Sequence, residues 1–153
     1  MTAINTLYET DFYQWALGNA ALLKAGRFGE LDIEHLVEEI ESMSRSERRE
    51  LLSRLVVLVT HLLKWHYQPE RQGNSWKNTI KVQRLSLHKL LAENPSLKPQ
   101  LVPMLVEAYE EARLQAAAET DMDDSVFPEA CPFSLDEVFR RDYFPNENDA
   151  VQK

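Results

Sequence analysis

The stretch ERRELLSRLVVLVTHLLKWHY, residues 47–67, decides the fold. It contains no glycine or proline, and at 100° per residue its apolar side chains between Leu51 and Leu63 cover about half of a helix circumference. A surface helix needs a narrower apolar stripe, so this segment is expected to be the central helix of a bundle. The helix should end before Pro69, because the residue that precedes a proline disfavours the helical conformation.

The segments around this helix also favour helices. Only four of the 153 residues are glycine, and Leu, Glu, Ala, Arg and Lys dominate long segments. Besides the central helix we expect four main helices: residues 6–26, residues 32–43, residues 75–94, and a helix that begins at about Pro99 or Pro103 and ends near residue 119. The second of these has an apolar face that is expected to be buried, made by Ile33, Leu36, Val37, Ile40 and Met43.

Two boundaries of the expected fold depend on local signals. Ser44 and Glu47 have the spacing of a capping box, so either a new helix begins there or one long helix continues with a bend. The aromatic-rich segment SVFPEACPFSLDEVFRRDYFP, residues 125–145, should form an arm that packs across the bundle. It should contain a short helix capped by Ser134 and Glu137, which have capping-box spacing. The fold expected is all-α, a single-domain helical bundle over residues 1–145, with a flexible tail over residues 146–153.

The composition excludes several classes of protein. Hydrophobic residues make up 44% and charged residues 27%, which is typical of a globular domain. The net charge of -8 opposes general nucleic-acid binding. No apolar run approaches the roughly 18 residues of a membrane span, and the N-terminal stretch lacks a signal-peptide pattern, so we expect a cytosolic protein. The single cysteine, Cys131, is expected to be a structural thiol, and no metal or cofactor is predicted.

One group of candidate functional residues is polar and centres on His61. Arg54, His61 and Lys64 share the polar arc of the central helix, whereas His66 lies about 140° away from His61 and cannot join it around one ion. On the preceding helix Glu38 and Glu41 lie in an acidic row. If the two helices pack antiparallel, these carboxylates approach His61, either as a metal or acid–base site or as a salt-bridged seam.

A second group forms a basic ridge on the fourth helix. Lys77, Lys81, Arg84 and His88 fall within an arc of about 60°. Arg71 from the preceding loop adds a guanidinium fork, and Trp76 adds a stacking surface. The ridge either pairs with acidic helices of the same chain or simply faces water, or it binds an anionic ligand or an acidic protein.

Several motifs occur in an order that resembles the bacterial domain-of-unknown-function 29 family. They are DFYQW at 11–15, LVEEIESM at 36–43, HLLKWHYQPER at 61–71, SW at 75–76 and CPF at 131–133. The resemblance covers roughly residues 5–145 and implies a helical fold and a bacterial source, without an established activity, cofactor or catalytic residue.

Two function classes follow from the candidate residues. The first is a non-catalytic binding or protein-interaction module that uses the basic ridge of the fourth helix. The alternative is a metal-binding protein or a hydrolase-like enzyme that uses His61 with Glu38 or Glu41. Oligomeric state and partner identity are left open by the sequence.

Overall fold

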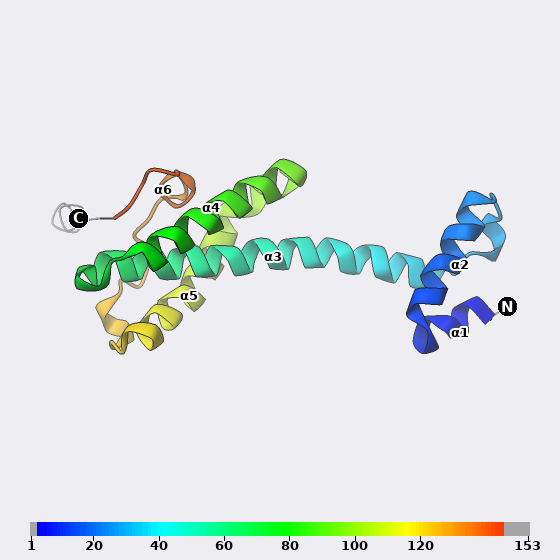
Figure 1. Ribbon diagram of the computed structural model, residues 1–153, viewed down its shortest axis with the longest axis horizontal. Coiled ribbons are helices and arrows are strands. Elements are labelled where there is room, and N and C mark those ends of the chain that lie inside the picture. Colours follow the sequence, from blue (N-terminus) through cyan, green and yellow to red (C-terminus); the bar gives the residue numbers. More distant parts are fainter. Residues whose placement is uncertain (1–2, 146–153) are drawn as a thin grey trace. The chain divides into compact units, whose positions relative to one another are not determined.

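A computed structural model describes residues 3–145, and helices are the only regular elements among these residues (Figure 1). The longer helices are α1 (Ala3–Thr10), α2 (Phe12–Lys24), α3 (Ile33–Tyr67), α4 (Asn74–Glu93) and α5 (Leu101–Thr120). The short elements are the 3₁₀ helices η1 (Phe28–Glu30), η2 (Pro69–Arg71), η3 (Pro95–Gln100) and η4 (Asp124–Val126), and the α-helix α6 (Leu135–Phe139). The predicted all-α fold with five main helices is confirmed.

Two compact units divide the chain, one made of residues 1–47 and the other of residues 48–153. The first turns of α3 belong to the first unit and its later turns belong to the second. A single domain over residues 1–145 stays a prediction, because each unit is described by itself. The predicted tail over residues 146–153 lies outside the described residues.

Helix α3 is continuous over 35 residues, so the alternative in which a new helix begins at Ser44 is wrong. Residues 41–50 are all exposed, yet they are rich in Glu and Arg, which favour the helical conformation without help from burial. The segments predicted as a second and a central helix are therefore two parts of one helix.

The predicted first helix is interrupted at Asp11, which is a correction to the sequence-based boundaries. Asp11 has φ -154° and ψ 81°, and its carboxylate accepts a hydrogen bond of 3.1 Å from the backbone N–H of Gln14. An aspartate at this position satisfies an N–H that has no partner inside the helix, so α2 begins anew at Phe12. The helix ends before Gly26, whose positive φ of 73° suits the end of a helix, as predicted.

The apolar face predicted for the first turns of α3 is not buried, which is a second correction. The exposed fractions are 56% for Ile33, 50% for Val37, 64% for Ile40 and 65% for Met43, and only Leu36 of the predicted face is half-buried. Helices α1 and α2 contact a different face of α3, where the ring of Tyr8 stacks on that of His35 with centroids 3.9 Å apart. The apolar face is left open within this unit.

The core of the second unit forms around the later turns of α3, as expected for a central helix. Five leucines of α3 are fully buried: Leu51, Leu55, Leu58, Leu62 and Leu63. They belong to one cluster with Ile80 and Leu87 of α4 and with Met104, Ala108 and Ala112 of α5. The small side chains of α5 allow a close approach of the helices, so the three helices share one core.

The C-terminal arm packs against this core through aromatic side chains. Phe127, Phe133 and Tyr143 are buried members of the cluster. Helix α6 begins with the predicted capping box, in which Ser134 and Glu137 bond each other's backbone N–H groups. The arm is therefore a fixed part of the second unit, and Figure 1 shows α6 beside α4.

Candidate functional site

Arg84 of α4 fastens the C-terminal arm. Its side chain is 1% exposed, and its guanidinium donates hydrogen bonds to three backbone carbonyls of the arm: Nε to Val138 at 2.9 Å, Nη1 to Tyr143 at 2.7 Å and Nη2 to Glu137 at 3.0 Å. A longer bond of 3.5 Å joins Nη1 to the carbonyl of Arg141. Burial lowers the pKa of the Arg84 guanidinium to about 10, so the group still carries its charge at neutral pH.

His88 lies one turn further along α4 and serves the same arm. Its Nε2 lies 2.8 Å from the carbonyl oxygen of Phe139, so the ring nitrogen donates to the backbone. Two of the four residues of the predicted basic ridge, Arg84 and His88, therefore bond to the arm of the same chain. Arg84 and His88 do lie on the same face of α4 as Lys77 and Lys81, but the arm covers the side chains of Arg84 and His88.

Lys81, in the exposed part of the ridge, lies near Arg141, a cationic residue of the arm that was not predicted as a site residue. Lys77 and Lys81 are exposed, and Lys81 lines a pocket of about 310 Å³ together with Arg84, Leu85 and Arg141. Arg141 comes from the arm, so α4 and the arm together surround this basic pocket with three cationic side chains. The neighbouring Asp142 is exposed and lies 3.5 Å from the guanidinium of Arg140.

Arg71 and Trp76 do not line the basic pocket. Arg71 is an exposed residue at the end of η2. The ring of Trp76 is half-buried and faces Lys64 of α3, whose Nζ lies 4.7 Å from the ring centroid. The predicted fork and stacking surface are thus separated from Lys81, and Trp76 instead stabilises a buried cation.

Lys64 belongs to a partly buried ion pair between α3 and α5. Its ammonium donates a hydrogen bond of 2.7 Å to Glu119 Oε1, and only 9% of the lysine side chain is exposed. Gln115 donates to the other oxygen of Glu119 at 2.8 Å. Burial raises the pKa of the Glu119 carboxyl, but the hydrogen bonds from Lys64 and Gln115 outweigh burial and hold this pKa below its usual value.

His61 is half-buried in a pocket of about 290 Å³ between α3 and α5. The lining includes the polar residues Ser53, Thr60, His61, Glu111, Gln115 and Glu119. The Nδ1–H of His61 donates to the carbonyl of Val57 at 2.8 Å, and burial lowers the pKa of the imidazole. Burial therefore favours the neutral form of the ring, which is oriented by the backbone of its own helix.

The predicted approach of Glu38 and Glu41 to His61 assumed two separate helices packed antiparallel. All three residues instead belong to the one helix α3, so the structure gives no support to that arrangement. Arg54, predicted to join them, pairs instead with Glu50 at 3.1 Å. Among residues 3–145 no group of three or more His, Cys, Asp or Glu side chains could hold a metal ion.

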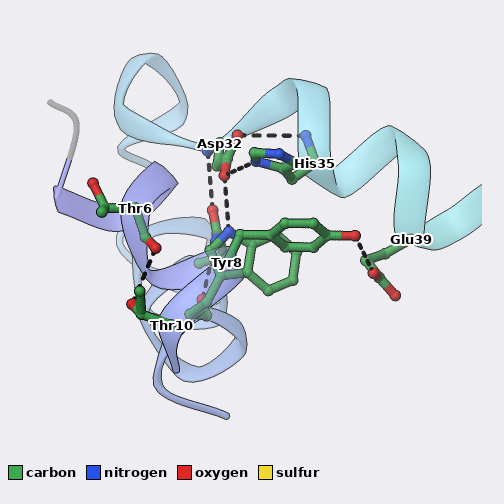
Figure 2. Close-up of polar contacts among 8 residues, drawn as sticks. Thr6, Tyr8, Thr10, Asp32, His35 and Glu39 are labelled. Carbon is green, nitrogen blue, oxygen red and sulfur yellow. Dashed lines mark hydrogen bonds and ion pairs between the residues drawn. The ribbon is translucent and has the colours of Figure 1, made fainter. Parts of the chain in front are cut away.

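A buried polar network in the first unit was not predicted from the sequence (Figure 2). The carboxylate of Asp32, 3% exposed as a residue, accepts hydrogen bonds of 2.9 Å from the indole of Trp15 and 2.7 Å from His35 Nδ1. The backbone N–H of Asp32 donates to the side chain of Asn19 at 3.0 Å. The network ties α2 to the first turn of α3.

The charges of this network stabilise each other. Burial raises the pKa of Asp32, but the hydrogen bonds from Trp15 and His35 outweigh it, and the pKa lies below its usual value. The hydrogen bond to Asp32 raises the pKa of His35. Beside this pair, the Tyr8 hydroxyl donates to Glu39 at 2.5 Å, and this bond raises the pKa of Tyr8 to about 12. The Asp32 and His35 spacing of three residues was the available signal in the sequence.

Comparisons with known proteins place the chain in a family. No curated protein and no solved structure matches it. Within the described part of the chain no helix is both long enough and apolar enough to cross a membrane. The family model described as "Domain of unknown function DUF29" matches residues 7–144, which extend from the first unit through most of the arm. The chain therefore belongs to the DUF29 family.

Proposed function

We propose that this chain is a non-catalytic binding module of the bacterial cytosol that recognises an oxyanion at the basic pocket of Lys81, Arg84, Leu85 and Arg141. The oxyanion is a carboxylate or a phosphate, carried either by an acidic protein or by a small anionic ligand. The observation that supports the proposal is the charge of the pocket, because three of its four lining side chains are cationic and none is acidic.

The donors around the pocket combine one rigid group with two mobile ones. Four hydrogen bonds from Arg84 to the arm occupy four of the five N–H groups of its guanidinium, and one N–H of Nη2 is left for a ligand. Lys81 and Arg141 are exposed and can turn toward a bound anion. A donor that is fixed before binding loses less conformational entropy when the ligand arrives, which favours affinity.

Binding is favoured over catalysis by the kinds of side chain present. Among the described residues, no Ser, Cys, His, Asp or Glu side chain lines the pocket, so it lacks the commonest nucleophiles and general bases. His61, the imidazole proposed as an acid or base, lines a different pocket, between α3 and α5. An anion held at the basic pocket would therefore meet positive charge without a reacting group.

The proposal is tested by titrating the full chain with inorganic phosphate and, separately, with a short peptide of Asp and Glu. Binding is measured by the shifts of backbone amide signals in NMR spectra at two salt concentrations. We expect shifts at α4 and the arm that weaken as the salt concentration rises, because salt screens exposed charges. Binding of phosphate indicates a small anion as the ligand, and binding of the peptide alone indicates an acidic protein. Binding of neither contradicts the proposal.

A matched pair of variants separates this pocket from general charge effects. Lys81→Glu with Arg141→Glu reverses the two exposed lining cations, and Lys77→Glu with Lys89→Glu makes the same charge change at exposed positions outside the lining. We expect at least a tenfold loss of affinity in the first variant and less than a threefold loss in the second. Equal losses would reject the pocket as the site. Arg84 is left unchanged because it fastens the arm.

A further inference from the structure

The first turns of α3 present an apolar stripe that nothing in the first unit covers. The stripe consists of Ile33, Val37, Ile40 and Met43, whose exposed fractions lie between 50% and 65%. At 100° per residue the four side chains fall within an arc of about 120°. A contiguous exposed apolar surface of this kind marks an interaction site more often than scattered single residues do.

An acidic row runs along one side of this stripe. Glu34, Glu38 and Glu41 are exposed and lie within an arc of about 60° beside the apolar side chains. Within the described part of the chain, these three carboxylates form no ion pair with Lys or Arg. Their charges are therefore available to a partner.

The charge of the whole unit has the same sign as this row. Residues 1–47 contain nine Asp or Glu and only three Lys or Arg, so most of the chain's net charge of -8 lies in this segment. A nucleic acid or an anionic lipid surface would be repelled by such a unit. A second copy of the same unit would bring two acidic surfaces together, which is also unfavourable.

We infer that the stripe and the acidic row dock a cationic amphipathic helix of another protein. The apolar face of that helix covers Ile33, Val37, Ile40 and Met43, and its flanking Lys or Arg side chains face the acidic row. Recognition of a helix by a combined apolar and charged surface follows the helix-in-groove mode, in which apolar anchors recur at helical spacing. This surface lies in the first unit and does not depend on the oxyanion pocket proposed above.

The inference is tested with two synthetic helical peptides of 18 residues and the full chain. Both peptides carry Leu on one face; one carries Lys on the other face and the second carries Glu. Binding is measured by the fluorescence anisotropy of a dye on the peptide. We expect the Lys peptide to bind and to lose affinity as the salt concentration rises, and the Glu peptide to bind at least tenfold more weakly.

Matched exposed positions on α5 supply the controls. Ile40→Ser is compared with Val106→Ser, because the two side chains are 64% and 69% exposed, and Glu38→Lys is compared with Glu110→Lys. We expect Ile40→Ser and Glu38→Lys each to weaken binding of the Lys peptide by about five- to tenfold, and the α5 variants to change it less than twofold. Circular dichroism checks that every variant keeps its helix content.

Two outcomes would overturn the inference. Equal losses in the α3 and α5 variants would mean that the Lys peptide senses only the overall charge of the chain. Sedimentation gives the second outcome: if the chain associates with itself and Ile40→Ser makes it monomeric, the stripe binds a second copy and not a cationic helix.

Discussion

Replacing Arg84 by methionine should release the C-terminal arm from α4. Methionine keeps the length and much of the apolar stem of the side chain but removes its charge and all of its donors. The carbonyls of Val138, Tyr143 and Glu137 would each lose a hydrogen bond of 2.7 to 3.0 Å. These three bonds join residues that are 53 to 59 positions apart in the sequence, so no local interaction replaces them.

The expected loss of stability follows from those three bonds. A hydrogen bond from a charged donor contributes about 1.5 kcal/mol at the low end of its range, which gives about 4 to 5 kcal/mol for three. Burial of the methionine side chain returns roughly 1 kcal/mol. We therefore expect the free energy of unfolding to fall by about 3 to 4 kcal/mol, which corresponds to a decrease in Tm of roughly 10 °C.

Urea denaturation followed by circular dichroism measures this loss, and hydrogen exchange of the arm amides locates it. Lys81→Met is the control, because Lys81 lies three residues earlier on α4 and is exposed; a surface substitution of this kind changes stability by about 0.5 kcal/mol or less. If Arg84→Met and Lys81→Met have the same free energy of unfolding within about 0.5 kcal/mol, the guanidinium does not fasten the arm.

Three further predictions concern other parts of the chain. Lys64→Met should lower the free energy of unfolding, measured in urea, by about 1 to 2 kcal/mol, because it leaves the partly buried carboxylate of Glu119 without its cation. The double variant Lys64→Met, Glu119→Gln should recover part of this loss, because it also removes the carboxylate. Ala112→Leu should destabilise the core by about 1 to 3 kcal/mol, measured by thermal unfolding, since Ala112 is fully buried among packed helices. The Asp32–His35 pair should stabilise the first unit most between about pH 4 and pH 6.5. The pKa of His35 is raised in the folded chain, so the stabilisation by His35 is lost as the pH rises through this pKa. The pKa of Asp32 is lowered, so the stabilisation by Asp32 is lost as the pH falls through this pKa. Hydrogen exchange of α2 across this pH range measures the effect, and an Asp32→Asn variant that keeps the same pH profile would contradict it.

The sequence was most informative where local chemistry decides the structure. Leu51 to Leu63 predicted the central helix from periodicity alone, and Ser134 with Glu137 predicted the start of α6 from capping-box spacing. The break at Asp11 was missed although aspartate is a strong helix cap, because the apolar pattern continues through it.

The candidate site depended on contacts between distant segments, which periodicity does not reveal. The arc of the basic residues on α4 was predicted correctly, yet the arm covers Arg84 and His88 and leaves Lys81 to line a pocket with Arg141. The hydrogen bond from the indole of Trp15 to Asp32 also joins distant residues, 17 positions apart, and periodicity does not reveal it either. A helical projection gives the direction of a side chain, and the partner that meets it comes from elsewhere in the chain.

Helix α3 shows on a single element the difference between side-chain periodicity and actual burial. Ile33, Val37 and Ile40 follow one another at spacings of four and three residues, and Leu51, Leu55 and Leu58 repeat the same spacings. The first set is at least 50% exposed, whereas the second is fully buried in a core shared with α4 and α5. Equal periodicity therefore predicts that both sets can be buried, but only in the second unit do other helices cover the apolar side chains. The unused capacity of the first set, bordered by unpaired carboxylates, is the physical reason to expect that its cover comes from a second molecule.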